Sequence, residues 1–172
     1  MNERHEFTTW KSPLGKLWLS ATEKGMAAIH FGEPDEREQR RWRRYGLPHS
    51  RRNDDAPLLL ETLHQLEAYF HGERTAFDLP LDLRGTPFQK RVWEEVARIP
   101  YGQTRTYGMI AEAIGKPLAA RAVGQAVGRN PIVIVIPCHR VVAANGKLGG
   151  FSSGLWRKEA LLVLEGIIPP AG

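Results

Sequence analysis

The stretch IVIVIPCHRVV, residues 132–142, decides how this chain is interpreted. A run of β-branched residues before Pro137 is typical of a buried strand that ends at the proline. This prediction places Cys138, the only cysteine, where a strand opens into a turn. His139 is a candidate base and Arg140 a fixed positive charge, and both favour the reactive thiolate. The alternative is a small buried side chain with an inert thiol.

Composition indicates a globular protein of a reducing compartment. The chain has 172 residues and 42% hydrophobic content, enough for one large domain or two small ones. One cysteine forms no internal disulfide and no cysteine-rich zinc site, so we expect a cytoplasmic setting, no metal and no cofactor. Residues 1–6 lack the apolar core of a signal peptide, and no stretch reaches membrane-spanning length, so we expect no membrane partner.

The formal charge of +5 favours a polyanionic partner such as nucleic acid. Much of the excess lies in an arginine-rich run over residues 37–52. Such a run is more typical of a solvated segment than of a binding surface, and we assign it no role.

The sequence predicts two domains of an α+β protein. Hydrophobic periodicity in the first half predicts strands over 15–20 and 26–31, a helix over 56–70 and an alternating segment over 77–83. The turn signal at Gly85 then marks a boundary. We expect an α/β N-terminal domain with a small antiparallel sheet over residues 1–84, and a C-terminal domain over residues 85–172.

The C-terminal domain is predicted to be mainly helical and to resemble a winged helix-turn-helix. Thr86 and Gln89 have the spacing of a capping box, so a helix is expected to start at Pro87. Two further helices, over 106–114 and 118–128, are joined by a glycine-containing turn, as in a helix-turn-helix, although other helical hairpins look similar.

The third of these helices carries few large side chains. Gly124 and Ala122 lie in a run of alanine and glycine, with Arg121 near its start. Glycine inside a helix costs about 1 kcal/mol relative to alanine, so its presence indicates that something approaches the backbone closely. That partner is either another helix or a narrow DNA groove into which the arginine inserts.

Several separated motifs carry a resemblance to one family. In chain order they are TPFQ (86–89), IPYG (99–102), RAVG (121–124), NP (130–131), PCHRV (137–141), KE (158–159), LL (161–162) and EG (165–166). Through them the second half closely resembles the O6-alkylguanine-DNA alkyltransferases, and the first half resembles the family's N-terminal domain more loosely, mainly at SPLG (12–15).

The resemblance implies direct DNA repair. Cys138 would take the alkyl group of a flipped O6-alkylguanine, and also of O4-alkylthymine, in one irreversible turnover that leaves S-alkylcysteine. The implied partner is double-stranded DNA with alkylated bases, bound through the minor groove with little dependence on sequence. The protein is expected to be a monomer in solution, and clustering on DNA stays open.

The resemblance also implies roles for residues around the thiol. Cys138, His139 and Glu165 would form a relay with a water between sulfur and imidazole, Asn130 would brace the turn around the cysteine, and Tyr107 would donate to N3 of the base.

Further residues are implied for the base and the DNA. Ser152 would bind the O6 side, the carbonyl of Val141 the exocyclic amine, and Lys158 would support the site. Arg121 would enter the base stack, and we expect Ala122, Gly124, Thr106 and Tyr107 to lie against the DNA.

Three alternatives remain at this point. A lesion-binding protein of the alkyltransferase-like class shares the fold but lacks the reactive cysteine, which Cys138 argues against. A winged-helix regulator would need base-reading side chains on the third helix, where alanine and glycine predominate. A Cys-His hydrolase would need an oxyanion hole, which no motif indicates.

Overall fold

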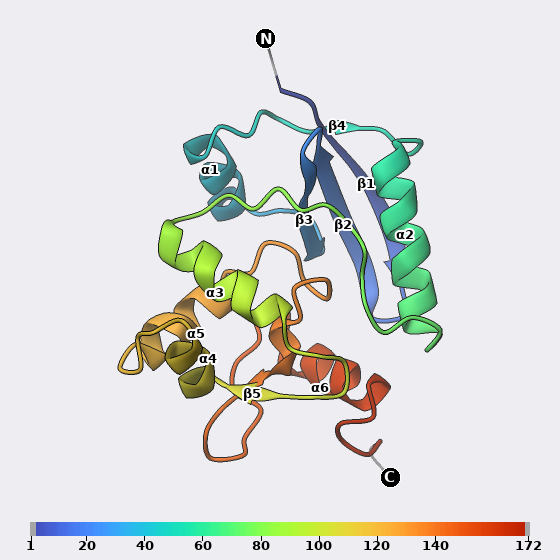
Figure 1. Ribbon diagram of the computed structural model, residues 1–172. Coiled ribbons are helices and arrows are strands. Elements are labelled where there is room, and N and C mark those ends of the chain that lie inside the picture. The colour runs from blue at the N-terminus through green and yellow to red at the C-terminus, as the bar shows by residue number, and fades with distance from the viewer. Residues whose placement is uncertain (1–2, 171–172) are drawn as a thin grey trace. The chain divides into compact units, whose positions relative to one another are not determined.

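The computed structural model describes residues 3–170 and divides into two compact units, Met1–Gly85 and Thr86–Gly172 (Figure 1). Sequence analysis placed the boundary one residue earlier. The mixed α and β content of the structure matches the predicted α+β class. No helix within residues 3–170 combines the length and the apolar character that crossing a membrane requires.

The first unit is built on a four-stranded sheet of order β3-β2-β1-β4. Its strands are β1 (His5–Ser12), β2 (Gly15–Thr22), β3 (Gly25–Phe31) and the short β4 (Arg51–Arg52). The first three pair antiparallel, and β4 is parallel to β1. The predicted strands over 15–20 and 26–31 are therefore confirmed as β2 and β3.

The predicted alternating segment over 77–83 forms only an isolated bridge, between Leu81 and Met26 of β3. The amide of Met26 donates to the Pro80 carbonyl at 2.8 Å, and no amide is available on Pro80 to extend a ladder. The backbone of Pro80 lies so close to Gly25 that a Cβ there would come within 2.6 Å of it. The glycine is thus required by this close approach as well as by its positive φ.

Two helices complete the first unit. Helix α2 (Pro57–Phe70) matches the predicted helix and packs on β1 and β2 through buried residues that include Leu59 and Leu66. Helix α1 (Glu36–Arg44) was not predicted, because Trp42 is its one buried residue and the many arginines around it leave no apolar periodicity in the sequence. The Trp42 ring stacks on Trp18 with 5.2 Å between centroids, which anchors this highly charged helix.

The second unit is mainly helical, as expected. It contains α3 (Pro87–Ala97), α4 (Tyr107–Ala113), α5 (Ala120–Gly128), the 3₁₀ helix η1 (Cys138–Arg140) and α6 (Leu155–Leu164), with a parallel pair of short strands, β5 (Arg105–Thr106) and β6 (Val141–Val142). The predicted capping box of Thr86 and Gln89 is confirmed, with both reciprocal hydrogen bonds present. Helices α3, α4 and α5 pack against one another.

The strand predicted over 132–136 is wrong. The segment is largely buried, but Ile134 has a φ of 73°, and the amide of Val135 donates to the carbonyl of Val133 at 2.8 Å, which closes a γ-turn. A β-branched residue with positive φ is a true outlier, and such strain persists only where the surroundings impose it. Cys138 accordingly starts a 3₁₀ helix and does not sit at a strand end.

Candidate active site

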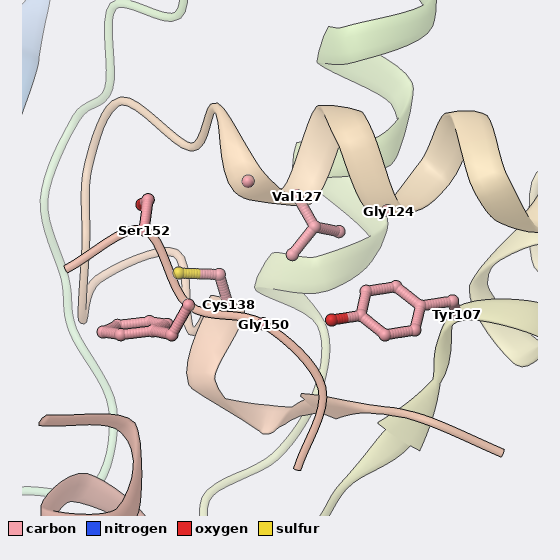
Figure 2. A pocket seen from close by; sticks show the side chains of 8 residues that line it. Tyr107, Gly124, Val127, Cys138, Gly150 and Ser152 are labelled. Atoms are coloured by element: carbon pink, nitrogen blue, oxygen red, sulfur yellow. The ribbon is translucent and has the colours of Figure 1, made fainter. Parts of the chain in front are cut away.

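Cys138 lies at the inner wall of a cavity of about 410 Å³. The thiol-bearing residue is 5% exposed. The cavity is lined by Tyr107, Gly124, Val127, Gly128, Cys138, Gly150, Phe151 and Ser152, which come from α4, α5, η1 and the loop before α6 (Figure 2). A volume of this size is typical of small-molecule sites, and here it presents one nucleophilic sulfur.

Asn130 imposes the shape of the segment that carries Cys138. Its Nδ2 donates to the Ile136 carbonyl at 2.7 Å, and its Oδ1 accepts from the Ile132 amide at 3.0 Å. The Ile136 carbonyl also accepts from the Cys138 amide at 2.8 Å. One side chain thus satisfies backbone groups that a neighbouring strand would otherwise pair, which explains why this β-branched run folds into a loop.

Burial raises the pKa of the Cys138 thiol to about 11. A hydrogen bond from Asn130 and the positive charge of Lys158 oppose this rise because they favour the thiolate. Arg140, which the sequence suggested as the neighbouring charge, instead directs its guanidinium to Glu165. At neutral pH the sulfur therefore needs a base to become nucleophilic.

His139, the next residue in the chain, is the candidate for that base. Its Nε2 donates to Glu165 Oε2 at 2.6 Å, and its Nδ1 has no hydrogen-bond partner within residues 3–170. Burial lowers the pKa of His139, which Glu165 opposes through its hydrogen bond and charge. A neutral imidazole with an unoccupied nitrogen accepts a proton from a neighbouring thiol, directly or through one water.

The carboxylate of Glu165 is shared between histidine and arginine. Arg140 donates from Nε to Oε1 at 2.8 Å and from its second terminal nitrogen to Oε2 at 3.0 Å, and the Gly102 amide donates to Oε1 at 3.2 Å. Glu165 is the C-cap residue of α6, and 6% of its surface is exposed. The sequence does not reveal that Arg140 belongs to this network, since adjacency to His139 does not show which way a side chain points.

Tyr107, the first residue of α4, forms another part of the cavity wall. Figure 2 shows its hydroxyl directed toward the side where Cys138 and Gly150 lie. Burial raises the pKa of Tyr107, and a hydrogen bond with the Gly150 backbone partly opposes the rise. Gly124 of α5 lies against the ring, where a Cβ would be 3.7 Å from the tyrosine Cδ1.

Ser152 lines the cavity, whereas Val141 and Lys158 are not among the described residues that do. The Lys158 ammonium donates to the carbonyl of Val141 at 2.6 Å and to that of Gly150 at 3.2 Å. Burial lowers the pKa of Lys158 to about 8. The Lys158 ammonium therefore links the loop before α6, at Gly150, to β6, at Val141.

The residues expected to contact DNA lie on α5 and at the start of α4. Arg121 and Ala122 are exposed in the first turn of α5, and Gly124 of the same helix reaches the cavity. The Thr106 hydroxyl caps α4 by accepting from the Met109 amide at 3.1 Å. Helix α5 therefore has an exposed arginine and, at the cavity, Gly124, Val127 and Gly128. Val127 and Gly128 were not among the predicted site residues.

Comparisons with known proteins cover both units. Residues 87–167 match the family described as 6-O-methylguanine DNA methyltransferase, DNA binding domain, and residues 6–83 match the ribonuclease-like domain of the same protein family. A methylated-DNA--protein-cysteine methyltransferase of Methanosarcina acetivorans is 46% identical over 93% of this chain and 97% of its own length. One of Mycolicibacterium paratuberculosis is 46% identical over 96% of this chain and 95% of its own.

The fold is similar to solved structures as well. The crystal structure of Mycobacterium tuberculosis OGT in complex with DNA has a TM-score of 0.83 and 44% identity, covering 96% of both chains. The crystal structure of the same organism's O6-methylguanine methyltransferase has a TM-score of 0.82 and 44% identity, over 97% of this chain and 96% of that one.

Proposed function

The chain belongs to the methylated-DNA--protein-cysteine methyltransferase family, and from this premise we propose that it repairs DNA by transferring the alkyl group of O6-alkylguanine to Cys138. The observation that carries the proposal is a buried thiol facing a cavity, followed in sequence by a histidine that is hydrogen-bonded to a buried glutamate. This is the arrangement of a nucleophile, a base and a group that orients the base.

The reaction is a displacement at carbon. The thiol proton passes to Nδ1 of His139, and the sulfur attacks the alkyl carbon as the bond from that carbon to O6 breaks. The electron pair of that bond goes to the purine, which takes up one proton and leaves as guanine. The thioether product has no leaving group that would restore the thiol, so each molecule reacts once.

Residues of the cavity act on the base. The Tyr107 hydroxyl donates toward N3 and thereby lowers the energy of the departing guanine anion, and Ser152 donates to the O6 side. Asn130 holds the turn that aims the sulfur, and Lys158 stiffens the opposite loop through its two carbonyl contacts. The Val141 carbonyl, which accepts from Lys158, is the group we propose for the exocyclic amine, although Val141 is not among the described residues that line the cavity.

The DNA contact that we propose is made by α5. Arg121 enters the base stack in the minor groove and fills the space of the flipped nucleotide, while Ala122, Gly124 and Thr106 allow close approach to the backbone. Such contacts depend weakly on sequence and strongly on salt.

The proposal extends to three further properties. The protein acts as a monomer, accepts O4-alkylthymine as a second substrate, and works in the cytoplasm, where its thiol stays reduced.

The decisive test is intact-mass analysis after incubation with a duplex that contains O6-methylguanine. We expect a gain of one methylene per molecule, located on the Cys138 peptide and absent from Cys138→Ser. Tight binding of the lesion with an unchanged mass would instead identify a lesion-binding protein without transferase activity.

A further inference from the structure

Arg140 is a buried arginine whose donors converge on the relay. In addition to its two bonds to Glu165, it donates from its remaining terminal nitrogen to the Ile99 carbonyl at 2.6 Å. Its side chain is 7% exposed, and its guanidinium carbon lies 5.7 Å from the centre of the Tyr101 ring. Three hydrogen bonds to three buried acceptor atoms, on two residues, fix the plane of the guanidinium, which a lysine could not reproduce.

The two-pronged contact also fixes Glu165. Oxygen Oε1 accepts from Arg140 and from the Gly102 amide, while Oε2 accepts from Arg140 and His139. A carboxylate has about four lone-pair positions, so this one is fully used. The oxygen that faces the imidazole therefore cannot turn away without breaking bonds to the guanidinium.

The same contact changes the charge that His139 faces. The charged groups that act on the imidazole are the Glu165 carboxylate at the end of α6, Arg140 of η1 and Lys158 of α6, and the Tyr101 ring lies against the guanidinium. A buried carboxylate that served the histidine alone would strongly stabilise an imidazolium. Here the guanidinium already neutralises the carboxylate, and both Arg140 and Lys158 disfavour the protonated ring.

We propose that Arg140 is a positioning residue, which clamps Glu165 side-on and shares its charge, so that His139 rests as a neutral base beside the Cys138 thiol. The inference rests on the proposed transfer reaction, because it assigns His139 the task of accepting the thiol proton. In the alternative arrangement, Glu165 would keep His139 protonated in the resting protein, and the ring could not accept the thiol proton.

The test measures His139 directly in the free protein. The pKa of the ring is followed by NMR of ¹⁵N-labelled histidine, with the signal of His139 identified by its loss in His139→Gln. In Arg140→Met we expect the pKa of His139 to rise by about one unit, because one positive charge within hydrogen-bond distance of its partner is removed. In Arg140→Lys, which keeps the charge but not the two-pronged geometry, the rise is expected to be smaller.

The pH profile of the single-turnover transfer rate is the second measurement. A protonated His139 cannot accept the thiol proton, so the rate falls on the acid side as the ring is protonated. This acid limb should move to higher pH in Arg140→Met by the same amount as the NMR titration, which is about a tenfold loss of rate at a pH well below the limb. Arg98→Met, at an exposed arginine that pairs with Glu95, should leave the profile unchanged.

A double variant separates positioning from simple loss of packing. The direct repulsion between Arg140 and a protonated His139 remains in a Glu165→Gln background, but the part that acts through the carboxylate is lost. Arg140→Met should therefore shift the His139 titration by a clearly different amount in that background than in the wild type. An unchanged His139 titration in folded Arg140→Met, or an equal shift in both backgrounds, would overturn the proposal. Should Arg140→Met not fold, Arg140→Lys decides the same question, and a wild-type pKa there would count against it. Because the titration uses no DNA, failure of this proposal is distinguishable from failure of the transfer reaction.

Discussion

At the scale of single residues, Asn130 determines where the sulfur lies. Asn130→Ala leaves the Ile136 carbonyl and the Ile132 amide buried with one partner fewer each. We expect a loss of about 1 to 3 kcal/mol in the free energy of unfolding, measured by urea denaturation, because a buried group left unsatisfied costs about that much. The unsatisfied group is the Ile132 amide, since the Ile136 carbonyl keeps its hydrogen bond from the Cys138 amide. The transfer rate should fall as well, because the turn before Cys138 is no longer held.

Asn130→Asp is the matched control. Its carboxylate still accepts from the Ile132 amide but cannot donate to the Ile136 carbonyl. Equal stability of Asn130→Ala and the wild type would show that the loop does not depend on this side chain.

Lys158 makes a second prediction about a single residue, concerning stability and pH. Its pKa is about 8 in the folded protein, against an ordinary value of 10.5. Between these values the unfolded chain holds the proton and the folded chain has lost it, so the contribution of Lys158 to stability rises with pH across this window. The free energy of unfolding of the wild type relative to Lys158→Met should therefore increase from pH 8 to pH 10.

This comparison is best made in a Cys138→Ser background. The thiol, whose folded pKa of about 11 lies above its ordinary value, would otherwise contribute stability that is lost over an overlapping range. Lys90→Met, at an exposed lysine of α3, serves as the control and should show no such trend. A flat difference for Lys158 as well would mean that its ammonium is better solvated than the structure indicates.

At the scale of the elements, the loop before α6 contains two glycines with positive φ, of which only one lies against another side chain. Gly149 has a φ of 76°, and a Cβ there would lie 2.8 Å from the Tyr107 hydroxyl oxygen, whereas Gly146 has a φ of 82° and nothing within 4 Å. Alanine at either position adopts an unfavourable backbone conformation at a cost of about 1 to 2 kcal/mol. Only Gly149→Ala should also slow transfer, because it displaces the tyrosine.

The measurement compares single-turnover rates of Gly149→Ala and Gly146→Ala with their thermal stabilities. Similar losses of stability combined with different rates are the expected result. If Gly146→Ala slowed transfer as much as Gly149→Ala, the effect would belong to backbone strain and not to contact with Tyr107.

Local signals in the sequence predicted some of these elements and missed others. The capping box at Thr86 and the periodicity of α2 act within one turn or one helix, so they are visible in sequence. The run 132–136 was interpreted as a strand because hydrophobicity and β-branching report burial, but not the distant side chain that replaces a partner strand. Helix α1 was missed because its charge pattern conceals Trp42.

The candidate site shows the same division. Motifs pointed to Cys138, His139, Glu165 and Tyr107. The structure places Cys138 and Tyr107 at one cavity and joins His139 to Glu165 by a hydrogen bond. The contact of Arg140 with Glu165 depends on where α6 ends relative to η1. That relation is set by packing of the whole unit, and no spacing in the sequence reports it.

At the scale of the whole molecule, the proposed DNA contact of α5 predicts a difference between substrates. Arg121→Ala should lower transfer from a duplex by about 10- to 100-fold, because flipping a base costs a few kcal/mol that the arginine helps to offset. Transfer from a free O6-alkylated guanine, which needs no flipping, should change little. Both rates are measured under single-turnover conditions by intact mass.

Arg129→Ala provides a control on the same helix, since Arg129 is exposed at the C-cap of α5, remote from its first turn. It should affect duplex transfer only through the general electrostatic attraction to phosphates. Equal losses on duplex and free base in Arg121→Ala would rule out a role in flipping.

The chain has a single cysteine, and that residue lies at the cavity. Any sulfhydryl reagent applied to the unfolded protein therefore counts one group per molecule, and that group is the one that the proposed transfer would consume. The fraction of molecules whose cysteine no longer reacts would then give the number of lesions repaired per protein molecule, without a separate assay of DNA. A sequence with one thiol thus supplies its own active-site titration.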